Sequence, residues 1–151
     1  MAINGSTFIS QTTLFLRSSL ASGIVDPLSG TRASNEPFVM TSYPEKPVKY
    51  PIITVKSLNP TMIQRGGMQS QDTYDSLPFE IRVWARNERE KDHLAEDVST
   101  WLRLNQFSGT YSTITQGLFG FNRTSMVDVD ENDKQGVKSK VMEFEWRFVN
   151  I

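Results

Sequence analysis

Residues 77–105 read LPFEIRVWARNEREKDHLAEDVSTWLRLN and change from a strand pattern to a helix pattern almost without a loop. In the first part every second residue is apolar, which is typical of a strand with one buried face. Asn87 can then cap a helix, and Glu90 follows three residues later, at the spacing of a capping box. One apolar stripe continues at helical spacing through Leu94, Val98, Trp101, Leu102 and Asn105. This stretch predicts a sheet with a long helix laid across it.

The flanking sequence adds one helix and several strands. Ser6 can cap a first helix that ends near Gly23, and its apolar side holds Phe8, Ile9, Thr12, Phe15, Leu16 and Leu20. Strands are predicted at residues 38–43, 50–56, 77–86, 111–116, 124–130 and 141–149. A glycine-rich connection at 117–121 and a polar turn at 130–136 separate the later strands. The order predicts an α+β fold: a mostly antiparallel sheet, two main helices packed on one face, and a long loop between the second and third strands.

Residues 57–76 show the least periodicity in the chain. They contain Asn59-Pro60, the Gly66-Gly67 pair and a polar run from Gln69 to Asp75. A loop of about 20 residues without secondary structure is uncommon in a compact domain and usually has a function. We therefore expect an extended arm that becomes ordered on a partner. Its candidate contact residues are Met62, Ile63, Arg65 and Met68.

The composition fits one domain over residues 1–151. Sixteen Lys and Arg residues oppose 17 Asp and Glu residues, which gives a formal net charge of −1, and no run of basic residues predicts nucleic-acid or lipid binding. With no cysteine, the chain has no disulfide and no thiol nucleophile. The apolar residues near the start are interrupted by polar ones, so neither a signal peptide nor a membrane span is predicted.

The candidate catalytic and metal-binding residues all have simpler interpretations. His93, the only histidine, lies among charged helix residues, so we expect it to be exposed to solvent rather than part of a hydrolytic triad. The acidic run from Asp128 to Asp133 lacks the glycine and the closing glutamate of a calcium loop. The glycine pairs do not form a phosphate-binding motif. The sequence therefore predicts no catalytic site, no cofactor and no metal site.

The polar faces of two strands are the better candidates for function. Glu143 and Glu145 share one face of the last strand, where they could form an acid/base pair, a hydrated outer face or a subunit interface. Arg147 on that strand and Arg82 on residues 77–86 could supply ionic partners for an interface. Trp84 lies between Arg82 and Arg86, so it is either an interface anchor or buried under the first helix.

This order of elements, together with the block at 77–105, resembles the tail terminator and tail-completion proteins of long-tailed bacteriophages. The resemblance covers most of the chain and rests on the layout and size of the elements. It implies an α+β fold shared with head-tail joining proteins, and a homo-oligomeric ring, usually a hexamer. Such a ring caps the tail tube protein and presents a docking surface to the neck or head connector. It also implies assembly in the host cytoplasm, a place in the virion, and passage of DNA through the lumen without sequence recognition.

We therefore expect a structural virion protein without enzymatic activity, whose contacts lie on residues 77–86, 141–149 and the arm. A neighbouring head-tail connector protein is the nearest alternative. A small monomeric enzyme with a site of scattered Asp, Glu and Arg residues is an alternative from another class. A monomeric adaptor that binds proteins through its sheet edges is a third.

Overall fold

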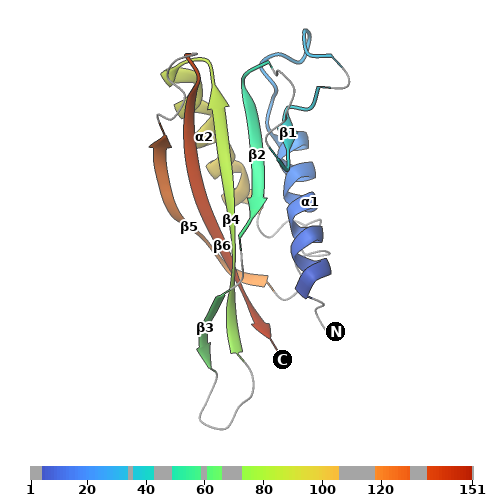
Figure 1. Cartoon of the computed structure of the whole chain (residues 1–151), viewed down its shortest axis with the longest axis vertical. Coiled ribbons are helices and arrows are strands. Elements are labelled where there is room, and N and C mark those ends of the chain that lie inside the picture. The colour runs from blue at the N-terminus through green and yellow to red at the C-terminus, as the bar shows by residue number, and fades with distance from the viewer. Residues whose placement is uncertain are drawn as a thin grey trace.

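The computed structural model describes residues 5–33, 36–42, 49–58, 61–65, 73–105, 118–129 and 136–150. Two helices pack on one face of a sheet, so the predicted α+β fold is confirmed (Figure 1). The elements are α1 (Gly5–Gly23), β1 (Val39–Met40), β2 (Ile52–Ser57), β3 (Thr61–Arg65), β4 (Thr73–Ala85), α2 (Glu88–Asn105), β5 (Leu118–Val129) and β6 (Lys138–Asn150).

The sheet is built around β4 and β6, which pair along their whole length of 13 residues each. The strand order is β1-β2-β4-β6-β5, and β3 also pairs with β4. All neighbours are antiparallel except β1 and β2, which run parallel. The sheet is therefore mixed but mostly antiparallel, as predicted.

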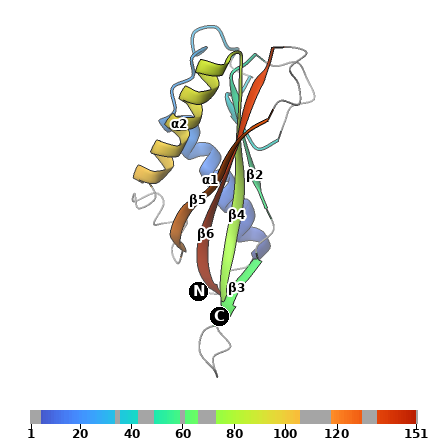
Figure 2. The same cartoon turned by 90° about the vertical axis from the view of Figure 1, so that its left-hand side faces the viewer.

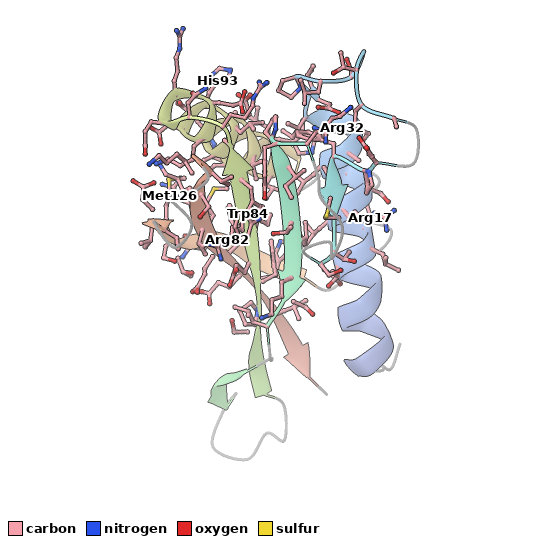
Figure 3. All side chains as sticks on the ribbon, turned by 45° about the horizontal axis from the view of Figure 1, so that its top comes forward. Arg17, Arg32, Arg82, Trp84, His93 and Met126 are labelled. Atoms are coloured by element: carbon pink, nitrogen blue, oxygen red, sulfur yellow. The ribbon has the colours of Figure 1, made fainter. Side chains whose placement is uncertain are left out.

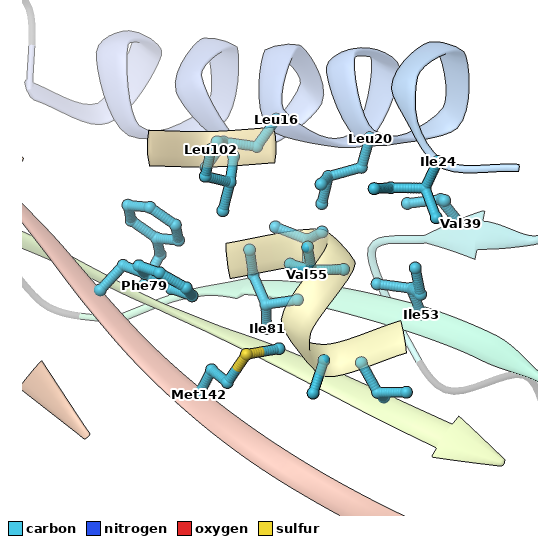
Figure 4. Packing of buried hydrophobic residues seen from close by; sticks show 14 of the residues in the cluster. Leu16, Leu20, Ile24, Val39, Ile53, Val55, Phe79, Ile81, Leu102 and Met142 are labelled. Carbon is cyan, nitrogen blue, oxygen red and sulfur yellow. The ribbon is translucent and has the colours of Figure 1, made fainter. Parts of the chain in front are cut away.

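The main core lies between the helices and the sheet. On β4 the predicted apolar face is buried: Leu77, Phe79, Ile81, Val83 and Ala85 are at most 2% exposed. Figure 4 shows α1 lying over the strands, with Leu16 and Leu20 directed toward the residues of the sheet. From α2, Leu94, Val98 and Leu102 complete the same cluster. The apolar sides of β4 and α2, which the periodicity of residues 77–105 predicts, thus pack against each other.

The beginning of α2 is fixed by side chains at the strand-helix junction. The Glu90 backbone N–H donates to Asn87 Oδ1 at 2.9 Å, which confirms the predicted cap. The Glu90 carboxylate accepts hydrogen bonds from the Arg86 backbone N–H and guanidinium. The pKa of Glu90 is below its usual value, chiefly because of the Arg86 side-chain hydrogen bond. The junction therefore turns from strand to helix within two residues.

The prediction of a structureless loop at 57–76 is wrong for the part that the structure describes. Thr61–Arg65 forms β3, and β4 begins at Thr73 rather than Leu77. The Leu58 N–H donates to the Pro78 carbonyl at 3.0 Å, so pairing with β4 continues between β2 and β3. Long-range pairing with β6, such as Thr73 with Asn150, explains why a polar segment is a strand. Residues 66–72, and with them Met68, lie outside the described residues.

The far end of this hairpin projects beyond the helices. Figures 1 and 2 show β3 and the beginning of β4 extending past the body of the domain, next to the end of β6. The register agrees, because Thr61 pairs with Ser76 while Thr73 pairs with Asn150. The predicted arm is therefore a three-stranded extension of the sheet. We call this part, formed by residues 61–65, 73–76 and 147–150, the projecting end.

Two other strand predictions had the wrong bounds. β5 begins at Leu118, so residues 118–121, predicted as a connection, belong to the strand. Its pairing with β6 is irregular at two places, between Phe119 and Asn122 and between Arg123 and Ser125. The strand predicted at 38–43 is only Val39–Met40, and residues 111–116 lie outside the described part of the chain.

Candidate functional site

The face of the sheet away from the helices is the largest surface built from the predicted contact residues. Both described helices pack on the other side; Figure 2 shows α2 lying to one side of the strands. Register places on this face Thr54, Lys56, Glu80, Arg82, Trp84, Ser125, Val127, Val141, Glu143 and Glu145. We call this surface the open face. Most of its side chains are only half-buried, as expected for one uncovered side of an antiparallel sheet.

Trp84 occupies one corner of the open face and is only 8% exposed. It packs with Met40, Ile52 and Val137 in a second small core. Its indole N–H donates to Thr54 Oγ1 at 3.3 Å. Because this core lies across the sheet from the helices, the interpretation that Trp84 is buried under the first helix is wrong. It is not an exposed anchor either.

Arg82 covers the Trp84 ring from the open face (Figure 3). Its guanidinium carbon lies 3.9 Å from the ring centroid, within the range of a cation–π contact. Arg82 Nη2 also donates a hydrogen bond to Ser139 Oγ at 3.1 Å, which fixes the side chain in place. Arg82 therefore holds a positive charge in a defined position on the open face.

The centre of the open face holds three carboxylates and one lysine. Glu80 on β4 stands between Glu143 on β6 and Lys56 on β2, directly opposite both, and Glu145 is the next residue on the same face. Ser76 donates to Glu145 Oε2 at 3.0 Å. The side chains of Glu80 and Glu143 form no ion pair or hydrogen bond with any residue in the described ranges. Like charges directly opposite each other destabilise a sheet, so a cation brought to this position would relieve the repulsion.

The remaining predicted contact residues are placed as follows. Arg86 lies past the end of β4 and pairs with Glu90, so it belongs to the helix cap rather than to the open face. Arg147 is opposite Ser76, which puts it in the open-face row at the projecting end. Met62, Ile63 and Arg65 belong to β3 at the same end. The structure thus brings Arg82, Glu143 and Glu145 together and places Arg86 elsewhere.

A network of charged residues joins α2 to the outer strands. Lys91 is 2% exposed, and its ammonium contacts Glu88 and, at 2.9 Å, Asp128 on β5. Lys140 on β6 approaches Asp92 at 2.8 Å and Asp128 at 3.6 Å. The hydrogen bond from Lys91 is the main reason that the pKa of Asp128 lies below its usual value. Asp128 is thus held by two lysines, and the rest of the acidic run, 130–133, lies outside the described residues.

Lys91 is not among the residues of interest predicted from the sequence, although its position on α2 is unusual for a lysine. Lys91 precedes Leu94 by three residues and Val98 by seven, so it falls on the apolar stripe of α2. Its carbon chain is buried along the stripe while the ammonium reaches the carboxylates at the edge. A charged residue at such a position indicates a fixed ionic contact.

Replacing Lys91 by methionine should change the free energy of unfolding by less than about 1 kcal/mol. Methionine keeps the buried chain, and the Glu88 and Asp128 side chains that lose their partner are 60% and 53% exposed, so water can solvate them. Lys91→Ala, which also empties the buried space, should cost about 2 kcal/mol or more. Urea unfolding of both variants measures the difference. Equal losses would show that the ionic contact, not packing, is the stabilising part.

A groove lies between α2 and β5 and has a volume of about 710 Å³. It is lined by Asp92, Glu96, Ser99, Thr100, Arg103, Asn122, Arg123, Met126, Lys140 and Phe144. Arg123 donates to Ser99 Oγ at 3.1 Å across it. The rim carries both acidic and basic groups and therefore shows no preference for one ligand charge. Glu80, Glu143 and Glu145 do not line this groove.

His93 is exposed, as predicted, and does not reach the groove. Its side chain is 76% exposed and lies 3.6 Å from Asp97, at the outer side of α2 (Figure 3). Within the described ranges, no group of three or more His, Asp or Glu residues is arranged to hold a metal ion. The described helices include none with the length and apolar character needed to cross a membrane. No protein-family model matches the chain, and no curated protein matches it significantly.

Proposed function

We propose that this protein is a structural subunit of a bacteriophage virion, a noncatalytic ring subunit that caps the tail tube and joins the tail to the neck. The observation that carries the proposal is the open face, where a charged and partly apolar sheet surface has no covering layer among the described residues. A neighbouring position in the head-tail connector is the alternative within the same class.

The open face has the composition of a contact surface between rigid subunits. It combines the fixed Arg82 guanidinium, the carboxylates Glu80 and Glu143, and the exposed apolar side chain of Val127. Surfaces between subunits join apolar area to a polar rim in this way. Since the strands beneath it also form the main core, the surface keeps its shape during assembly.

The projecting end supplies contacts of a different kind. It extends from the body of the domain along the strands, at one end of the open face (Figure 1). In a ring, such an extension can reach the lumen or an adjacent ring, while the open face makes lateral contacts. Growth of the tube would stop because the lower surface of the ring matches the tube subunit and the upper surface does not. DNA would pass through the lumen without sequence recognition.

Native mass spectrometry and electron microscopy of the purified protein test this proposal. We expect closed rings, with the hexamer as the main species, which bind the ends of tail tubes and stop the addition of further tube subunits. A second measurement is tube length, which should fall as the protein is added during tube growth. A protein that stays monomeric at every concentration and leaves tube length unchanged would contradict the proposal. Turnover of a small molecule by the monomer would favour the enzyme alternative.

A further inference from the structure

The exposed side of α1 is unusual for a helix in contact with water. Arg17 is the only charged residue among the 19 of Gly5–Gly23, whereas eight of the 18 residues of α2 are Asp, Glu, Lys or Arg. Within residues 12–23, the part of α1 whose burial is described, the exposed residues are Leu14, Arg17, Ser18, Ala21 and Ser22. Leu14 is 50% exposed, and Val25, just after the helix, is 83% exposed. Small and apolar residues in this pattern are typical of a helix that packs on both sides.

The open face offers a matching apolar strip. Val127 on the edge strand β5 is 57% exposed and lies directly opposite Val141 on β6. In the next row Lys56, Glu80 and Glu143 stand side by side, and neither glutamate forms an ion pair with a described residue. The strip therefore consists of the exposed Val127 and the half-buried Val141 beside two carboxylates that have no ion-pair partner among the described residues.

The charges of the two surfaces are complementary. Arg17 forms no ion pair or hydrogen bond with the described residues and points away from the strands on the outer side of α1 (Figure 3). Lys56 stands opposite Glu80 but forms no ion pair with it, so the Arg17 guanidinium can supply the direct ionic partner that the two glutamates lack. Leu14, three residues earlier on the same stripe, would then meet the valines.

The two surfaces also face in opposite directions. The buried side of α1, with Leu16 and Leu20, packs on the face of the sheet opposite to the open face. A contact between the outer side of α1 and an open face therefore has to join two copies, head to tail. A head-to-tail contact repeats from copy to copy and closes into a ring when the rotation permits.

We propose that the outer side of α1, from Leu14 to Val25, docks on the open face of the next copy of this chain. Arg17 then lies between Glu80 and Glu143, and Leu14 packs near Val127 and Val141. The neighbouring helix completes a layer on the second side of the sheet, as in domains whose sheets carry helices on both faces. This inference rests on the proposed ring and assigns its lateral contact.

Cysteine cross-linking tests the contact directly, because the natural chain has no cysteine. The double variant Leu14→Cys/Val127→Cys should form, under mild oxidation, a ladder of disulfide-linked species that ends at the size of the ring. Each single variant should stay unlinked. The matched control Arg89→Cys/Val127→Cys, with the first cysteine on the exposed side of α2, should give no ladder. Dimers from either single variant, or equal ladders from the control, would overturn the proposal.

A charge exchange provides the second measurement. Arg17→Glu and Glu143→Arg should each weaken ring formation at least tenfold in the concentration required, and the two together should restore it. Arg89→Glu, at an exposed position on α2, should have no effect. If the natural protein forms rings that neither single variant weakens, the α1 contact is wrong while the ring stands. If the natural protein forms no ring, both the function proposed above and this contact are overturned.

Discussion

Replacing Arg32 by alanine should lower the free energy of unfolding by about 3 kcal/mol, because the change removes one partner of a largely buried ion pair. Arg32 Nε and Nη2 donate to the two carboxylate oxygens of Asp26 at 2.7 and 3.1 Å. The guanidinium also donates to the backbone carbonyls of Lys49 and Pro51 at 2.7 and 2.8 Å. The side chains of Arg32 and Asp26 are 5% and 15% exposed, so water cannot replace the lost contacts easily.

The geometry explains why lysine would not substitute for Arg32. A planar guanidinium binds both oxygens of Asp26 and still reaches two carbonyls, whereas an ammonium has the wrong shape for this set. Arg32→Lys should therefore lose more than half of the stability lost by Arg32→Ala. Arg89→Ala, at an exposed position on α2, serves as control and should stay within about 0.5 kcal/mol of the natural protein. Chemical unfolding followed by circular dichroism measures all three. A loss below 1 kcal/mol for Arg32→Ala would contradict this account.

The same ion pair should produce a defined pH dependence. Burial raises the pKa of Asp26, but hydrogen bonds from Arg32 and from the Leu28 N–H, with the charge of Arg32, bring the net pKa below the usual 3.8. The stabilisation is therefore complete above the usual carboxyl pKa and is lost as the pH falls through the lower, folded-state pKa. The stability difference between the natural protein and Asp26→Asn should shrink over that acidic range. If the stability difference between the two proteins stays constant over that range, the Asp26 carboxylate is not the source of the pH dependence.

The parts of the fold that the sequence predicts correctly are determined by residues within a single strand or helix. The alternation of Leu77, Phe79 and Ile81, and the cap at Asn87, need no information from elsewhere in the chain. β3 and the beginning of β4 are different, because their pairing depends on β6, more than 70 residues later for Thr73 and Asn150. Polar strands of this kind carry no local apolar pattern, so the sequence alone favours a loop.

Among the predicted contact residues, too, some positions follow from one strand and others depend on distant parts of the chain. Glu143 and Glu145 are found on the polar face of β6 because the strand period places them there. Trp84 could not be placed, because its burial depends on Met40, Ile52 and Val137, which three other segments contribute. The opposition of Glu80 and Glu143 depends on strand register, which the sequence does not specify by itself. Which residues share a face is thus predictable from one strand, whereas which residues meet requires the sheet.

The second large effect is expected at the crossing of the two helices, where Gly23→Ala should cost about 1–3 kcal/mol through overpacking. A Cβ atom added to Gly23 would overlap the indole ring of Trp101 on α2. The ring cannot move freely, because its N–H donates to Ser19 Oγ at 3.1 Å. Gly23 does not have a positive φ, so backbone strain contributes nothing and the cost comes from the ring alone.

A double-mutant cycle separates this effect from any other cause. In a Trp101→Ala background the overlap is absent, so Gly23→Ala should become neutral or stabilising, since alanine is favoured over glycine in a helix by about 0.5–1 kcal/mol. Gly30→Ala is the matched control, because a Cβ atom there meets nothing within 4 Å. Thermal unfolding of the four proteins of the cycle gives the coupling energy. If Gly23→Ala costs the same with and without the Trp101 ring, close packing at this crossing is not the reason for the glycine.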